Sequence, residues 1–461
     1  MEQPIDSPNI LGTAPISRLF FKYYKPTLIS LLSIMLHQVI NGIILGQKVG
    51  KAGIGAVGLY APVVIVLIAL TLPVMIGGGI LIGKYIGAGT YAKAQYIFQF
   101  ATTLALIFGG VIALSTPFIT KPIADFLAGK QNIELSHNLY DYIFWQFINM
   151  PFFILRMFWG NFLSNDGAPK ASRNGNLIAV GINILLDLVL VAGLGMGVKG
   201  ASIATAIAIF AACTYLYLYV QKHKGHIGFQ NFRFTARIKE WKEFINFGLP
   251  TFVSEISFAL GLVIINQNIL PYGAAVVAAF GMVNFVSFIF LRMITAAMLA
   301  CLPIMSYNIG AKLPERVLAV VRFSISFTLI LGITISCVGY LVPGLLIRLF
   351  SQSDTAEFRQ IAINSMSLYF LLFLAAGPNF ILSAYFQSIK KTGISILINV
   401  LKSSVFIWLF AAILPGYFKM GLNGIWLSRS FAEITTLLLL ISFTFLKKKE
   451  YYSLQAIASV N

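Results

Sequence analysis

The chain has 461 residues, of which 58% are hydrophobic and 10% are charged. A soluble domain carries about 25% charged residues, so this composition excludes a soluble globular protein and predicts an integral membrane protein. The formal net charge of +18 could indicate a nucleic-acid-binding protein, but the distribution of the basic residues, described below, argues against that class.

Apolar windows of roughly 20 residues recur along the chain, and each is long enough to cross a hydrocarbon core as a helix. Twelve such windows are centred near residues 36, 71, 105, 151, 185, 210, 256, 289, 334, 373, 404 and 435. The first run begins near Pro26 and is too long for a signal-peptide core, so we expect a retained helix. The sequence therefore predicts an all-α protein with twelve transmembrane helices.

The basic residues are distributed asymmetrically between the predicted loops. With the N-terminus placed in the cytoplasm, 21 of the 33 Lys and Arg residues lie in cytoplasmic segments and eight lie on the opposite side. The remaining four, Arg156, Arg292, Lys402 and Arg429, lie within predicted spans. This pattern follows the positive-inside rule and predicts a multi-pass protein of the inner (plasma) membrane with both termini cytoplasmic.

Two halves of the sequence resemble one another. KAGIGAVGL (51–59) aligns with AAVVAAFGM (274–282) at an offset of 223, and KPTLIS (25–30) aligns with LPTFVS (249–254) at 224. The basic, hydrophilic segment 221–243 separates the two halves. Six helices per half is an even number, so both halves enter the membrane from the same side. We therefore expect two lobes related by a pseudo-two-fold axis along the membrane normal.

This repeat fixes the predicted domains as an N-terminal lobe, 1–220, a cytoplasmic linker, 221–243, and a C-terminal lobe, 244–461. An internal repeat of this kind is typical of transporters, in which two lobes rock about a central substrate site.

The motifs that would indicate an enzyme fail on inspection. GGILIGKY (78–85) has Tyr85 where a phosphate loop needs Ser or Thr, and GMGVKG (195–200) lacks both the preceding strand and the downstream acid of a dinucleotide site. Neither the four histidines nor the three cysteines show the spacing of a metal site or a catalytic triad. We therefore expect neither enzymatic activity nor a cofactor.

Asp187 lies in the middle of the apolar run 177–195, where a charge costs roughly 2.5–3.5 kcal/mol. Asn183 precedes it by four residues and so lies on the same helix face. Burial disfavours the charged form of a lone carboxylate, which suits a group that binds and releases protons. The alternative is a structural aspartate hydrogen-bonded across helices, but acids inside membranes usually mark ion pathways.

Several segments resemble the multidrug and toxic compound extrusion (MATE) family, and especially its bacterial DinF/MepA-like branch. They are GAVGLYAP (55–62), GGGILIGKYIGAGTYAKA (77–94), NDGAPKAS (165–172), NILLDLVLVAGLGMGVKGASIATA (183–206), PIMSYNIGAKLPERV (303–317) and GLNGIWLS (421–428). The resemblance covers essentially all twelve helices. It implies an antiporter that exports hydrophobic organic cations by alternating access as H⁺ or Na⁺ enters.

The resemblance also implies a cation-coupling site in the N-terminal lobe. The family's helix 5 pair falls on Asn183 and Asp187, and its helix 6 threonine falls on Thr205. The helix 1 aspartate of the family is replaced here by Asn41, which leaves a site with one acid. Such a site favours H⁺, since Na⁺ at Asp187, Asn183 and Thr205 would meet only one formal charge.

In the C-terminal lobe, Glu255 matches the helix 7 glutamate of the NorM-like branch, but the predicted helix 10 contains no acid. Glu255 is therefore a secondary acid that could take a proton, hold a cationic substrate or pair with an intramembrane base. Glu433 lies four residues after Arg429 and is predicted to form an intrahelical ion pair with it. At the repeat offset Asp187 falls on Phe410 or Ala411, so we expect coupling mainly in the N-terminal lobe.

Gln38 and Asn161 are polar residues within spans and are candidates for lining the substrate cavity. The alternative to a drug antiporter is a lipid-linked oligosaccharide flippase of the same superfamily. A flippase would use the four intramembrane basic residues to hold a pyrophosphate, whereas pairing of those residues with acids would favour the antiporter.

Overall fold

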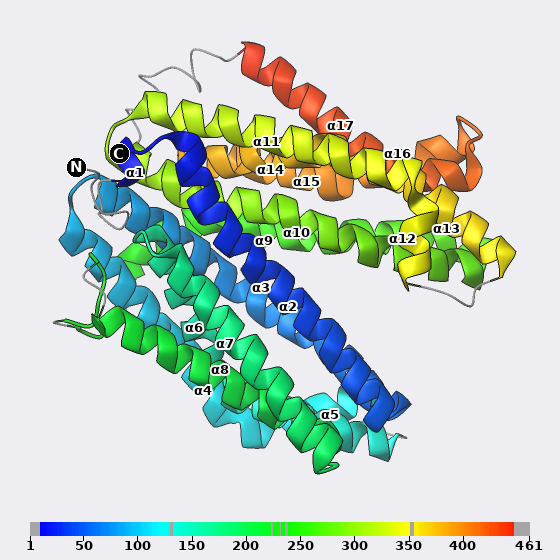
Figure 1. Ribbon diagram of the computed structural model, residues 1–461, viewed down its shortest axis with the longest axis horizontal. Coiled ribbons are helices and arrows are strands. Elements are labelled where there is room, and N and C mark those ends of the chain that lie inside the picture. Colours follow the sequence, from blue (N-terminus) through cyan, green and yellow to red (C-terminus); the bar gives the residue numbers. More distant parts are fainter. Residues whose placement is uncertain are drawn as a thin grey trace. The chain divides into compact units, whose positions relative to one another are not determined.

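The computed structural model describes residues 10–129, 132–222, 225–230, 232–235, 238–350 and 355–446. Every regular element in these ranges is helical, as Figure 1 shows. Helices form because lipid offers no hydrogen-bond partner to a bare backbone, so each apolar segment must satisfy its own N–H and C=O groups. Eleven helices in the described part are long and apolar enough to cross a membrane, which confirms an all-α membrane protein.

The first half of the chain contains eight α-helices and one π-helical segment. They are α1 (Ile10–Thr13), α2 (Ile16–Lys48), α3 (Lys51–Gly87), α4 (Tyr91–Ala128), α5 (Ile133–Ile148), α6 (Met150–Asn165), α7 (Pro169–Asp187), the π-helical η1 (Leu188–Gly193) and α8 (Gly197–Lys222).

The second half continues with α9 and ends with α17. Its elements are α9 (Ile238–Ile269), the 3₁₀ turn η2 (Leu270–Tyr272), α10 (Ala274–Gly310), α11 (Pro314–Leu341), α12 (Pro343–Phe350), α13 (Ala356–Tyr369), the 3₁₀ turn η3 (Phe370–Leu372), α14 (Phe373–Ser388), α15 (Thr392–Val400), the π-helical η4 (Leu401–Val405), α16 (Phe406–Gly416) and α17 (Gly421–Leu446).

The window expected near residue 151 is divided between two helices. α5 ends at Ile148 and α6 begins at Met150, with Pro151 in its first turn. A proline favours the start of a helix because it lacks the N–H that a helix interior needs. The span expected near residue 151 is therefore present, and it is made of two consecutive helices with a break at Asn149.

The chain divides into two structural units, and the three divisions fall inside the helices α1, α2 and α9. Unit 1 contains Met1–Leu11 and Lys25–Ile245, and unit 2 contains Gly12–Tyr24 together with Asn246–Asn461. The first turns of α2 therefore belong to unit 2, where the ring of Phe20 contacts those of Phe323 and Phe327 with centroids 5.2 and 5.1 Å apart. The remainder of α2 belongs to unit 1.

In unit 1 the segment after α8 is held against the helices by Asp166. Its carboxylate accepts the backbone N–H of His226 at 3.1 and 3.0 Å and the ring Nδ1 of His226 at 2.9 Å. Beside it, Gln95 donates to the Gly228 carbonyl at 2.6 Å and accepts the Gly228 N–H at 2.8 Å. Asp166 belongs to the NDGAPKAS motif, so part of that motif serves to anchor this segment.

In unit 2 glycines allow helix backbones to approach closely. A Cβ on Gly332 of α11 would collide with the Phe373 carbonyl, and one on Gly377 of α14 would collide with Thr328. Gly261 of α9 faces the backbone carbonyl of Ser403 in η4 in the same way. Small residues at such crossings are typical of helices packed within membranes. The contact at Gly261 fixes the position of η4, which carries Lys402.

Candidate functional site

Three of the predicted site residues, Asn183, Asp187 and Thr205, lie on the neighbouring helices α7 and α8 of unit 1. Asn183 and Asp187 lie on one face of α7 and are 2% and 0% exposed. Asp187 is the last residue of α7, immediately before the π-helical η1. π-helical segments interrupt the regular ladder of helix hydrogen bonds and are frequent at functional sites.

The Asn183 side chain connects three helices. It contacts His37 Nε2 of α2, Asp187 of α7 and Thr205 of α8. With the amide nitrogen toward Asp187, this nitrogen lies 2.8 Å from Asp187 Oδ2, and the amide oxygen lies 3.0 Å from both Thr205 Oγ1 and the Thr205 backbone nitrogen. The other carboxylate oxygen, Asp187 Oδ1, is buried and has no partner among the described residues.

The orientation of the Asn183 amide follows from its neighbours. An ionised carboxylate only accepts hydrogen bonds, so it requires the amide nitrogen to face it. With the nitrogen toward Asp187, the amide oxygen accepts from both the hydroxyl and the backbone N–H of Thr205. The reverse orientation would set the amide nitrogen against the Thr205 N–H, two donors with no acceptor between them.

Asn41 lies on α2 one helical turn from His37 and is 8% exposed. Its Oδ1 is buried and unpartnered among the described residues. The structure therefore brings Asn183, Asp187 and Thr205 into contact but gives Asn41 no hydrogen bond to them. Leu45, one turn further along α2, packs with Val191 of η1 and Ala201 of α8, which holds α2 beside the site.

Two further residues belong to this neighbourhood, and spacing along the sequence could not reveal them. Tyr142 of α5 is buried close enough to Asp187 to interact with its charge, and its ring meets that of Tyr60 at 5.2 Å. Arg156 of α6 interacts electrostatically with His37 and donates a hydrogen bond to Asn176 of α7. Both arrive from other helices, and only the packing of the helices brings them near.

The remaining predicted site residues lie apart from this cluster. Glu255 on α9 and Gln38 on α2 are exposed at the surfaces of their respective units. Asn161 on α6 is partly buried, and its backbone and side-chain oxygens accept from Asn165 at 3.0 and 3.3 Å. That Glu255 is a secondary acid stays a prediction. The same holds for Gln38 and Asn161 as residues that line the substrate cavity.

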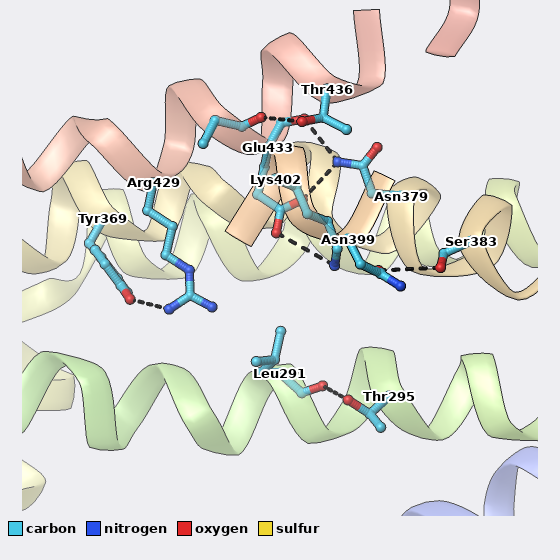
Figure 2. Close-up of polar contacts among 11 residues, drawn as sticks. Leu291, Thr295, Tyr369, Asn379, Ser383, Asn399, Lys402, Arg429, Glu433 and Thr436 are labelled. Atoms are coloured by element: carbon cyan, nitrogen blue, oxygen red, sulfur yellow. Dashed lines mark hydrogen bonds and ion pairs between the residues drawn. The ribbon is translucent and has the colours of Figure 1, made fainter. Parts of the chain in front are cut away.

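The predicted ion pair between Glu433 and Arg429 is wrong. Glu433 Oε1 instead lies 3.9 Å from Lys402 Nζ, and Arg429 donates to the Tyr369 hydroxyl at 2.5 Å (Figure 2). Spacing of four residues places two side chains on the same face of a helix, but a neighbouring helix can offer each a better partner. Arg429 finds an aromatic hydroxyl and ring faces, whereas Glu433 finds an ammonium.

The helices and the buried polar cluster define a class of protein, the polytopic membrane transporter. Comparison with known families gives the family within that class. The family model MatE matches residues 26–189 and again residues 250–413, two stretches that begin 224 residues apart. The chain belongs to the MatE family.

Relatives and solved structures agree with this assignment. The chain is 24% identical to "Multidrug export protein MepA" of Staphylococcus haemolyticus (strain JCSC1435) over 58% of each chain. It is also 24% identical to MepA of Staphylococcus aureus (strain NCTC 8325 / PS 47), over 65% of this chain and 66% of the relative. These alignments span less than two thirds of either relative.

Among solved structures, an outward-facing multidrug resistance MATE family transporter of the MOP superfamily superposes with a TM-score of 0.87 at 19% identity over 99% of both chains. A MOP superfamily transporter from Pyrococcus furiosus, described as having a binding pocket of reverse polarity, gives the same TM-score and identity over 98% of this chain and 100% of its own. At this identity the likeness concerns the fold.

Proposed function

We propose that the protein is a multidrug efflux antiporter that exports hydrophobic organic cations while protons enter through Asp187. Its two predicted lobes, 1–220 and 244–461, would alternate access across the inner membrane, with both termini and the linker 221–243 cytoplasmic. The MepA relatives support export of drugs as the activity. The observation that carries the coupling proposal is the fully buried Asp187 facing the Asn183 amide.

The chemistry of the site favours H⁺ over Na⁺ as the coupling ion. Asp187 would give a Na⁺ ion only one formal charge, and the amide oxygen of Asn183 already accepts from Thr205. A proton needs only the carboxylate and a partner that accepts either state. His37 lies on the other side of the same amide, with its Nε2 in contact with Asn183.

Partners of the intramembrane basic residues favour the antiporter over the flippase. Lys402 pairs with Glu433, Arg429 donates to Tyr369 and Arg156 donates to Asn176. The fourth, Arg292, interacts electrostatically with Glu255. A pyrophosphate would have to displace these partners before it could be held by the same cations.

The test uses proteoliposomes that contain a fluorescent organic cation and carry either a pH gradient or a Na⁺ gradient. We expect the pH gradient to drive transport by the native protein and Asp187→Asn to abolish it. His37→Gln should reduce the rate without abolishing it, since the carboxyl remains. Transport driven only by Na⁺ would contradict proton coupling, and undiminished transport by Asp187→Asn would exclude Asp187 as the coupling group.

A further inference from the structure

Unit 2 contains a lysine buried at membrane depth. Lys402 lies in the π-helical η4, well inside the span Thr392–Gly416, and is 2% exposed. Its ammonium lies 3.5 Å from the centroid of the Phe380 ring and 3.9 Å from Glu433 Oε1. A charge at this depth requires compensating partners. The aromatic face and the carboxylate provide them.

Glu433 approaches the same point from α17 and is 3% exposed. Its Oε2 accepts from Asn379 Nδ2 of α14 at 2.7 Å, and the same nitrogen donates to the Glu433 backbone oxygen at 2.9 Å. Asn379 is fully buried, and its Oδ1 has no partner in the described part of the chain. Figure 2 shows Lys402, Glu433 and Asn379 meeting from three separate elements.

The other charges nearby do not neutralise Glu433 directly. Arg429 lies one turn earlier on α17 but donates to the Tyr369 hydroxyl, and its guanidinium lies 4.6 Å from the Phe258 ring centroid. Glu255 of α9 interacts electrostatically with both Lys402 and Arg292 at longer range. The Lys402 ammonium is thus the ionic partner of Glu433 among the described residues.

The contacts of this ammonium are those of an ion in a cage more than those of a tight salt bridge. At 3.9 Å the ammonium is beyond the usual length of a direct hydrogen bond to the carboxylate. A carboxylate oxygen and an aromatic face are also groups that attract a small monovalent cation, and Asn379 holds the carboxylate in place.

We propose that Glu433, held by Asn379, and the ring of Phe380 form a monovalent-cation site that is filled by the chain's own Lys402 ammonium. Unit 2 therefore carries its cation permanently and needs none from solution. Removal of the ammonium leaves a buried, polar cavity with a negative charge, which a small cation such as Na⁺ can enter. This inference concerns ion binding in unit 2 and stands independently of proton coupling at Asp187.

The test measures thermal stability of the purified full chain in NaCl and in choline chloride at equal ionic strength. Asp187→Asn serves as the background, so that unit 1 contributes no salt-specific signal. We expect the background protein to melt at the same temperature in both salts. Addition of Lys402→Ala should lower the melting temperature in choline, and Na⁺ should recover several degrees because it binds the folded state.

Adding Glu433→Gln to Lys402→Ala removes the negative charge and should abolish the difference between the salts. Equal melting temperatures of the Lys402→Ala protein in Na⁺ and choline would overturn the proposal. If Lys402→Ala cannot be purified in choline, recovery in Na⁺ supports the site. If neither salt raises the melting temperature of the Lys402→Ala protein and only the added Glu433→Gln does, then Lys402 and Glu433 form a structural ion pair. That result would also overturn the proposal. Because no readout depends on transport, failure of the antiport proposal leaves the result interpretable.

Discussion

The side chain of Asn183 carries both a hydrogen-bond donor and an acceptor, and its three neighbours differ in which of the two they can pair with. Thr205 can accept or donate a hydrogen bond, and His37 can do either depending on its tautomer. Asp187 only accepts when it is ionised and can also donate when it is protonated. A single amide thus connects α7 to α2 and α8 through hydrogen bonds. An aliphatic side chain of the same shape would fill the space without performing this role.

We accordingly expect Asn183→Leu to reduce proton-driven transport at least tenfold while the protein remains folded. Leu has nearly the shape of Asn, so the packing of α7 on α8 should survive, but Asp187 loses its donor. The measurement is the initial rate of export under a fixed pH gradient, with melting temperature as the check on folding. A variant that transports at the native rate would show that the amide is dispensable.

Asp166 allows a second prediction at the scale of the residue, this time on stability. It accepts the backbone N–H of His226 at 3.1 and 3.0 Å and that of Ile227 at 3.4 Å. We expect Asp166→Ala to lower the free energy of unfolding by about 1–3 kcal/mol, measured by denaturation in detergent. The matched control is Asp141→Ala, whose ion-pair partner His137 is 76% exposed. A pair of this kind contributes about 0–1 kcal/mol, so equal effects would contradict the assignment.

The sequence predicts some of the polar contacts of unit 1 and not others, for a physical reason. Asn183 and Asp187 share a helix face because four residues make about one turn, and no tertiary information is needed to see this. Thr205 entered through resemblance to a family. His37, Tyr142 and Arg156 come from other helices, and only helix packing brings them near. The spacing of Glu433 and Arg429 predicts an ion pair on one helix for the same reason, because only helix packing reveals the contact of Glu433 with Lys402.

At the scale of the element, the π-helical segments are the features that hydropathy cannot reveal. η1 follows Asp187 directly, and η4 contains Lys402, so each interrupts a span beside a buried ionisable residue. Nothing in the apolar runs 177–195 or 392–416 marks the interruption, because it depends on how neighbouring helices pack. Pro151 does indicate the division between α5 and α6. A mean hydropathy over about 20 residues hides the effect of a single proline.

Gly261 gives a test of how η4 is held. Its backbone faces the Ser403 carbonyl so closely that a methyl group would force the two apart. We expect Gly261→Ala to lower the free energy of unfolding by about 1–3 kcal/mol through overpacking. Gly281 of α10 has open space where a Cβ would lie, so Gly281→Ala should be neutral or stabilising by about 0.5–1 kcal/mol. Equal effects of the two substitutions in a thermal melt would contradict the close contact.

At the scale of the whole molecule, the two halves share a pattern of helices but not their buried acids. Asp187 lies on the fifth span of the first half, and the position 223 residues later is Phe410. Glu433 lies on the sixth span of the second half, and the position 223 residues earlier is Phe210. The buried acids therefore do not follow the repeat, and the sequence repeat predicts the fold better than the chemistry.

Orientation in the membrane can be tested on the same scale. In a protein without its three native cysteines, Gln230→Cys in the linker should react with a membrane-impermeant maleimide only after cells are permeabilised. Glu134→Cys, at the start of α5, should react in intact cells. Both positions are exposed, so lack of labelling reflects the membrane and not burial. The reverse pattern would contradict cytoplasmic termini, because both termini are predicted to lie on the side of Gln230.

Two boundaries between the units have a mechanical consequence. One lies within α2, at Tyr24 and Lys25, and another within α9, at Ile245 and Asn246, so the chain passes through both as helix and not as loop. Pro26 and Pro250 lie close after these boundaries and occupy corresponding positions of the repeat. A proline removes a backbone hydrogen bond and lowers the resistance of a helix to bending. Both α2 and α9 are therefore easiest to bend beside the place where the chain passes from one unit to the other.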